Sequence, residues 1–253
     1  MSVIEWLIDR DPAIRWQVLR DLENASPADV AAERAKVEHD GWGARLLARE
    51  DPDGLWDGGA CFPASYRGGE PGQPWTATMH TLQALQLLGL DPASPSAYRA
   101  IALVAEHGRW EHAGQRYFDG EVEPCINGRA IRAGAYSGVD VEAIVERILT
   151  ERLADGGWNC EAENGSVRSS VDTTINVLDG LLEFERATGG SAPVRVSPLL
   201  ALRRAARARL LPVFGSRARL AAGRCRGCRS VEAAAGRPLA ARRRASRSRL
   251  LPA

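Results

Sequence analysis

A tryptophan on a glycine turn between two helical stretches recurs along this chain and constrains its fold more than any other feature. In the clearest copy, an apolar stripe at helical spacing over 141–153 leads into the turn Asp155–Trp158, and a second apolar stretch covers about 172–187. Glycine supplies the left-handed conformation that ends a helix, and a large indole fills the joint between neighbouring helices. The pattern therefore predicts two helices joined at a buried tryptophan.

The same unit is predicted at two earlier places. Trp56, Trp110 and Trp158 lie 54 and 48 residues apart, and no stretch alternates polar and apolar residues as a strand would. Segment 78–85 aligns with 174–181 without gaps and matches a threonine and two leucines. A helix pair that returns about every 50 residues is typical of a helical array or toroid, because one pair cannot bury both of its faces.

We therefore expect an all-α fold, an incomplete α/α toroid of stacked helix pairs over residues 1–192. At 253 residues and 45% apolar composition, the chain can bury one sizeable core. Asp11–Pro12 and Ser26–Pro27 are helix starts, which predict two short helices before the first unit. No apolar run approaches the roughly 20 residues of a membrane span, so no transmembrane segment is expected. Five cysteines, an odd number, do not indicate a disulfide framework, and a reducing, cytoplasmic setting is expected.

Charge is divided unevenly along the chain. From Val194 to the end there are 16 arginines, no lysine and one acidic residue, Glu232, a net charge of +15, whereas the rest carries −14. The repeated unit also stops there without a linker. We expect residues 193–253 to be a disordered tail or an aberrant, frame-shifted C-terminus. Such a basic segment can contact anionic membranes peripherally, whereas nucleic acid is not expected as a partner.

The unit resembles the repeat of the squalene cyclase and protein prenyltransferase superfamily, whose members are α/α toroids. That repeat has a glutamine at the end of an outer helix, followed by Gly-x-Trp. The corresponding residues here, with glutamate in place of glutamine, are Glu50 with Gly54–Trp56 and Glu151 with Gly156–Trp158; Gly108–Trp110 is a degenerate copy. The resemblance covers roughly residues 40–190. It implies a central apolar cavity for a terpenoid or prenyl ligand.

The catalytic motifs that the resemblance implies are incomplete. Class II cyclases of the family protonate their substrate with the middle aspartate of Asp-x-Asp-Asp-Thr, and the nearest match is Ser169–Thr173. Val171 stands at the position of the acid, and only Asp172 is retained, although protonation of a double bond needs a strong, preorganised acid. Protein prenyltransferases hold zinc with Asp, Cys and His, but no Asp-x-Cys followed by a suitable histidine is found. Neither a metal nor a cofactor is expected.

Two polar connections, 119–129 and 159–168, carry the candidate site. In a toroid both lie at the same end and can meet at the mouth of the cavity, and each offers two glutamates, a cysteine, at least one asparagine and an arginine. The candidate acid/base groups are Glu121, Glu123, Glu161, Glu163 and Asp172. The ligand-binding candidates here are Cys125, Asn127, Arg129, Cys160 and Arg168. The alternative is that the acids cap helices and pair with the two arginines, and that the thiols are structural.

Inner-helix residues complete the predicted site. His80 and Asn176 are equivalent in the repeat alignment and are expected to face the cavity with Asp172, or else to be satisfied core groups. Trp75 and Tyr117 are expected to line an apolar pocket or to stabilise a carbocation, with the core as the alternative.

The leading functional hypothesis is a terpenoid- or prenyl-binding protein of the cyclase and prenyltransferase type, with turnover left open. The second hypothesis is a non-catalytic helical scaffold. The third is an α/α-barrel enzyme that acts on a carbohydrate through its paired glutamates.

Overall fold

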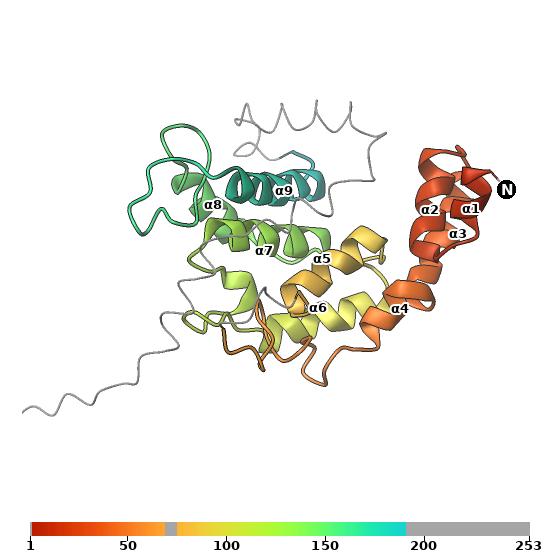
Figure 1. The fold of residues 1–253 in the computed structure, drawn as a ribbon, viewed down its shortest axis with the longest axis horizontal. Helices are drawn as coiled ribbons and strands as arrows, with labels where there is room; N and C mark the ends of the chain where they lie inside the picture. Colours follow the sequence, from red (N-terminus) through yellow and green to blue (C-terminus); the bar gives the residue numbers. More distant parts are fainter. Residues whose placement is uncertain (1, 69–74, 191–253) are drawn as a thin grey trace, which may run out of the picture.

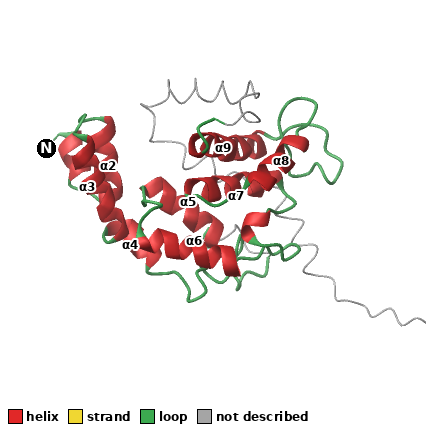
Figure 2. Cartoon of the chain, turned by 180° about the vertical axis from the view of Figure 1, so that it is seen from behind, coloured by secondary structure: helices red, strands yellow, loops and turns green. Residues whose placement is uncertain are grey.

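The described part of the chain, residues 2–68 and 75–190 of the computed structural model, is helical and has no strand (Figures 1 and 2). The helices are α1 (Val3–Ile8), α2 (Pro12–Asp21), α3 (Pro27–Ala35), η1 (Lys36–Glu38), α4 (Gly41–Leu47), α5 (Thr78–Leu88), α6 (Pro95–His107), η2 (Tyr117–Asp119), α7 (Pro124–Tyr136), α8 (Glu142–Thr150) and α9 (Val171–Ala187). The all-α prediction is confirmed. Among the described helices, none has the length and apolar character needed to cross a membrane. The arginine-rich tail at 193–253 lies outside the described residues.

The first three helices form a group at one end of the molecule, and α4 joins them to the rest (Figure 1). Helices α2 and α3 begin at the predicted caps: the Asp11 carboxylate accepts from the Ala13 N–H at 2.9 Å, and the Ser26 hydroxyl accepts from the Asp29 N–H at 3.2 Å. Helix α1 was not predicted. It starts with a capping box in which Ser2 and Glu5 each accept the other's backbone N–H.

The N-terminal helices dock on the end of α5. The Trp16 indole N–H donates to the Leu88 carbonyl at 2.8 Å, and the Arg34 guanidinium donates to the Gly89 carbonyl at 2.7 Å and the Tyr136 hydroxyl at 2.8 Å. Gly89 caps α5 with φ +98°, and a Cβ there would overlap the Trp16 ring. The position thus requires glycine both for its backbone conformation and for the packing against α2.

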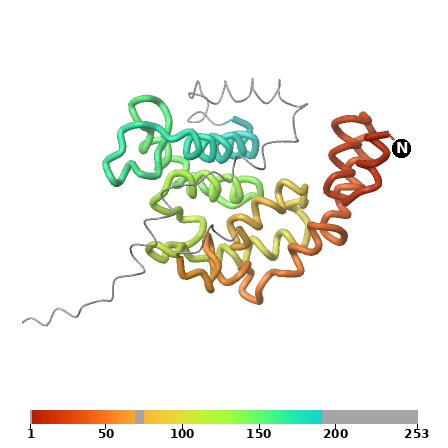
Figure 3. The backbone as a smooth tube through the Cα atoms, viewed as in Figure 1, coloured from red at the N-terminus to blue at the C-terminus, as the bar shows by residue number. Residues whose placement is uncertain are grey.

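Helices α7 and α9 lie side by side (Figure 3). Two glycines permit this close packing, because a Cβ on Gly180 would overlap the Gly128 carbonyl and a Cβ on Gly128 would overlap the backbone at Asn176. Helix α5 packs on the other side of α7. The N-terminal ends of α7 and α9 are therefore held in a fixed relation, and the candidate site lies there.

The first tryptophan turn is tied to both helices that it joins. The Trp56 backbone N–H donates to the Thr78 hydroxyl at 3.1 Å, and its indole N–H donates to the Leu46 carbonyl of α4 at 2.8 Å. Gly54 occupies the left-handed region at φ +82°. Trp56 is buried, as the pattern predicts.

The third turn repeats these contacts. The Trp158 backbone N–H donates to the Thr174 hydroxyl at 3.1 Å, and its indole N–H donates to the Ile148 carbonyl of α8 at 2.7 Å. Gly156 has φ +95°, and Trp158 is fully buried. Each of the two indoles thus donates to the carbonyl ten residues before it, and each backbone N–H donates to a threonine of the following helix.

The middle turn differs from the other two. The Trp110 indole N–H donates to the Tyr117 carbonyl at 3.0 Å, and the two rings stack at 4.5 Å between centroids. Its backbone N–H donates to the Gln115 carbonyl instead of to a helix threonine. Trp110 is nevertheless buried in the core. The copy with the weakest sequence match is thus also the one with different hydrogen bonds.

Candidate functional site

The segment that leads into α7 is clamped by Asn127. The Asn127 side-chain oxygen accepts from the Glu121 N–H at 2.7 Å, and its NH₂ group donates to the Glu121 carbonyl at 2.6 Å. The Glu123 N–H donates in turn to the Glu121 carboxylate at 2.6 Å. Asn127 is fully buried and both ends of its amide hold the backbone, so it positions this segment rather than contacting a ligand.

The two predicted polar connections meet at two buried thiols. The Cys125 and Cys160 sulfurs lie 2.8 Å apart, and a carboxylate oxygen of Glu123 lies 3.5 Å from the Cys125 sulfur. The Thr173 hydroxyl, in the first turn of α9, lies 3.3 Å from the Cys160 sulfur. All these side chains are buried. We name Glu123, Cys125 and Cys160 the thiol–carboxylate cluster.

The four predicted glutamates do not converge equally on this cluster. Glu121 and Glu123 are buried, whereas Glu163 is exposed and half-buried Glu161 accepts a hydrogen bond from the Asn164 side chain at 2.9 Å. Burial raises the pKa of Glu121, and the nearby charge of Glu163 adds to this rise. The hydrogen bond from the Glu123 N–H and the charge of His112 act in the opposite direction. Glu163 is thus within electrostatic reach of Glu121, and the site has an inner and an outer pair of carboxylates.

A second polar group lies across the three helices α5, α7 and α9. Arg129 of α7 has its Nη1 3.2 Å from His80 Nδ1 of α5, and it donates from Nε to the Asn176 side-chain oxygen of α9 at 3.3 Å. The Trp75 ring meets the His80 ring edge-on, at 4.6 Å between centroids. We name Trp75, His80, Arg129 and Asn176 the inner-helix row. Its arginine contacts a histidine and an amide, and not the acids of the alternative prediction.

His80 is a neutral acceptor in this row. Burial lowers the pKa of His80 to about 4, the positive charge of Arg129 contributes to the same shift, and a hydrogen bond to the backbone of Cys61 opposes it. Since Arg129 can only donate, His80 Nδ1 accepts, and the ring proton is on Nε2. At neutral pH the row therefore carries the charge of Arg129 alone.

The remaining predicted residues differ in burial. Tyr117 is fully buried against Trp110, and its hydroxyl has no hydrogen-bond partner among the described residues. Burial raises its pKa, and the charge of Arg129 acts against that rise, so this hydroxyl lies within electrostatic range of the row. Asp172 is exposed, and its carbonyl accepts from the Asn176 side chain at 2.9 Å. Arg168 is exposed.

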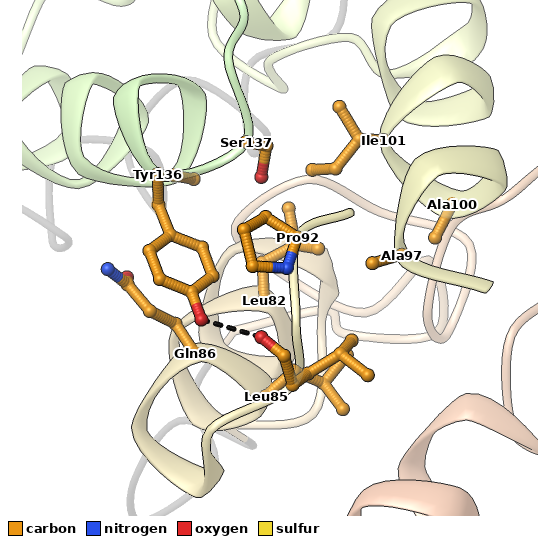
Figure 4. Close-up of a pocket in the computed structure, with 11 residues that line it drawn as sticks. Leu82, Leu85, Gln86, Pro92, Ala97, Ala100, Ile101, Tyr136 and Ser137 are labelled. Carbon is orange, nitrogen blue, oxygen red and sulfur yellow. Dashed lines mark hydrogen bonds between the residues drawn. The ribbon is translucent and has the colours of Figure 1, made fainter. Parts of the chain in front are cut away.

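Two pockets lie away from both groups. One is an apolar space of ≈ 30 Å³ between α5, α6 and α7, where Tyr136 donates to the Leu90 carbonyl at 2.6 Å (Figure 4). It has room for about one water molecule. The other is an open surface groove of ≈ 570 Å³ beside Trp42 of α4 and Leu87 of α5. Neither contains a predicted site residue.

Comparisons of this chain with protein-family models, with curated proteins and with solved structures find no match. A fold alone does not assign a function, so function must be inferred from the two groups of side chains.

Protein prenyltransferases, one branch of the superfamily that the repeat resembles, hold zinc with Asp, Cys and His, and the residues present can be compared with that set. Glu123 and Cys125 supply a carboxylate and a thiol at the same Asp-x-Cys spacing, and Cys160 brings a second thiol to them. Carboxylate and thiolate are both zinc ligands, so the donor set fits. The sequence prediction of no metal site considered only Asp-x-Cys followed by a histidine, and the approach of Cys125 to Cys160 depends on helix packing.

Proposed function

We propose that this chain is a helical-repeat protein of the squalene cyclase and protein prenyltransferase type that binds a prenyl diphosphate or a related terpenoid at the inner-helix row. The observation that carries the proposal is Arg129 of α7, held between His80 and Asn176, which come from two other helices. A cation fixed in this way is preorganised for a ligand.

The toroid part of the proposal is supported by the two matching turns. Trp56 and Trp158 make the same pair of hydrogen bonds, to a preceding carbonyl and a following threonine. In addition, α7 packs between α5 and α9, as successive inner helices of a toroid do. His80 and Asn176 were equivalent in the sequence alignment, and both contact Arg129.

The charge and exposure of the row favour an anionic, partly apolar ligand. Arg129 has no carboxylate within 4.0 Å among the described residues, and the guanidinium has five N–H donors. Such a fork binds phosphate in bidentate fashion. Trp75 is 48% exposed beside His80, and Val171 is 74% exposed at the start of α9. These two side chains offer apolar surface to an isoprenoid chain.

Calorimetric titration with farnesyl diphosphate tests the proposal. We expect saturable binding to the full-length chain that weakens at least tenfold in Arg129→Gln, because a charge-assisted contact to phosphate is lost. The exposed Arg152→Gln is the matched control and should bind as the parent does. Farnesol and inorganic diphosphate, titrated separately, apportion affinity between chain and head group. Absence of binding, or equal binding by both variants, contradicts the proposal.

Turnover is tested separately, by mass spectrometry of products after incubation with squalene or farnesyl diphosphate. The carbohydrate hypothesis is less well supported, because Glu121 and Glu123 are buried and one accepts the backbone N–H of the other. A glycosidase needs two carboxylates that flank an open site. The scaffold hypothesis remains the interpretation if none of these ligands binds.

A further inference from the structure

We infer that the thiol–carboxylate cluster binds Zn²⁺ through the Glu123 carboxylate and the thiolates of Cys125 and Cys160. One donor atom from each of the three residues lies within 4.8 Å of the other two. The inference goes beyond the ligand-binding proposal, and it assigns as the third ligand Cys160, a residue outside the Asp, Cys and His set of the resemblance.

The spacing of the donor atoms is close to that of a tetrahedral zinc site. With Zn–S of about 2.3 Å and Zn–O of about 2.1 Å, neighbouring ligand atoms lie about 3.6 to 3.8 Å apart. The oxygen of Glu123 and the sulfur of Cys125 are already 3.5 Å apart. The two sulfurs, at 2.8 Å, must separate by about 1 Å, which small rotations about the Cα–Cβ bonds can supply.

The surroundings hold the ligands in place and offer partners to metal-bound thiolates. Cys125 lies in the first turn of the 13-residue helix α7, where the helix dipole stabilises negative charge. The Thr173 hydroxyl, 3.3 Å from the Cys160 sulfur, can donate a hydrogen bond to its thiolate. Asn127 fixes the backbone at Glu121, two residues before Glu123. Such outer contacts orient metal ligands and raise their affinity.

The type of metal follows from the ligands. Two thiolates with one carboxylate suit zinc, whereas calcium and magnesium prefer oxygen ligands alone. His80 belongs to the inner-helix row, contacts Arg129 and is not part of the cluster. Three protein ligands leave a fourth position for water or another ligand, as in catalytic zinc sites.

Metal binding by the full-length chain tests the inference. Cys225 and Cys228 of the tail form a separate Cys-x-x-Cys, so both are replaced by serine in every protein compared. The reduced protein is titrated with Co²⁺ and then with Zn²⁺. We expect one ion per chain, near-ultraviolet thiolate-to-cobalt absorption, and bleaching of that absorption by Zn²⁺.

The variants assign the ligands. Cys125→Ser and Cys160→Ser should each reduce the charge-transfer absorption by about half or abolish binding. Cys61→Ser, which removes a third buried thiol outside the cluster, should leave it unchanged. Glu123→Gln tests the site without altering a thiol and should weaken Zn²⁺ binding at least tenfold. Circular dichroism of each variant checks the fold.

Three results would overturn the inference. The first is no uptake of Co²⁺ or Zn²⁺ by the reduced chain. The second is full absorption in Cys160→Ser, which would remove Cys160 as a ligand. The third is a Cys125–Cys160 disulfide, found by mass spectrometry of peptides, that persists under reducing conditions. All three leave the farnesyl diphosphate result at Arg129 untouched, so the two proposals fail separately.

Discussion

The turns at Trp56 and Trp158 share their hydrogen bonds, but the connections that follow them differ. After Trp56, the backbone N–H groups of Cys61 and Phe62 both donate to the Glu111 carboxylate, at 2.9 and 3.0 Å, and these bonds tie the connection to the loop after Trp110. After Trp158, the connection places the Cys160 thiol against Cys125 at the start of α7.

The difference separates the contacts that join the helices from the residues that form the candidate site. The turns at Trp56 and Trp158 share two contacts, from the indole N–H to a carbonyl and from the backbone N–H to a threonine hydroxyl. These contacts join one helix to the next at both turns. Groups with potential chemistry lie in the connection after Trp158 and on helices α5, α7 and α9. The turn Asp155–Trp158 is thus a structural joint next to the site.

Removal of the indoles is expected to have the largest effect. Trp56→Ala and Trp158→Ala should each lower the free energy of unfolding by about 3 to 5 kcal/mol, because both side chains are buried and both donate a hydrogen bond. Urea denaturation followed by circular dichroism gives the values. If one substitution costs less than half as much as the other, the two turns are not equivalent joints.

His80 and Asn176 occupy equivalent positions in the two copies, but only the histidine of this pair can titrate. The first copy should therefore make the stability of the fold depend on pH through His80. The pKa of His80 is about 4 in the folded chain and near 6.5 when unfolded, so the unfolded chain takes up the proton first on acidification. The stability contributed by neutral His80 is complete above pH 6.5 and is lost as pH falls towards 4, by about 3 kcal/mol.

His80→Gln should remove that part of the pH dependence, measured as urea stability at pH 7, 5.5 and 4.5. His39→Gln, at an exposed histidine, is the matched control. A parent profile that matches His80→Gln at every pH would show that His80 titrates normally.

The threonines should have a smaller effect that differs between the turns. Thr78→Val leaves the buried Trp56 N–H without its acceptor and should cost about 1 to 3 kcal/mol. Thr174→Val should cost less, because Thr174 is only half-buried and water can replace its hydroxyl. Equal losses from the two substitutions would contradict this role of burial.

Glu121→Gln is expected to have the smallest effect and the opposite sign. Because burial raises the pKa of Glu121, its charged form destabilises the folded state as pH rises through that pKa. A neutral glutamine can still accept the Glu123 N–H, so the variant should be slightly more stable than the parent at pH 7. The difference should vanish in acid. Glu146→Gln, at an exposed glutamate of α8, is the control, and a destabilised Glu121→Gln would contradict the assignment.

Much of the fold could be predicted because its signals are local. The caps at Asp11 and Ser26 define helix starts, and the buried tryptophans mark the turns. Helix α7 begins at Pro124, because proline suits the first helical position.

The site was only partly predictable because its contacts join distant parts of the chain. Cys125 and Cys160 are 35 residues apart, and their meeting depends on the close packing of α7 and α9 that Gly128 and Gly180 permit. The partners of Arg129 likewise come from α5 and α9 and not from neighbouring acids. Local patterns predicted which residues were candidates for the site, and helix packing decides which of them are in contact.

The most direct test is whether the connection after Trp158 supplies a zinc ligand. It can be made by zinc K-edge X-ray absorption of the zinc-loaded chain, with Cys225 and Cys228 replaced by serine. The account predicts two sulfur neighbours at about 2.3 Å with oxygen neighbours at about 2.0 to 2.2 Å, and a single sulfur in Cys160→Ser. A shell with no sulfur, or two sulfurs retained in Cys160→Ser, would contradict it.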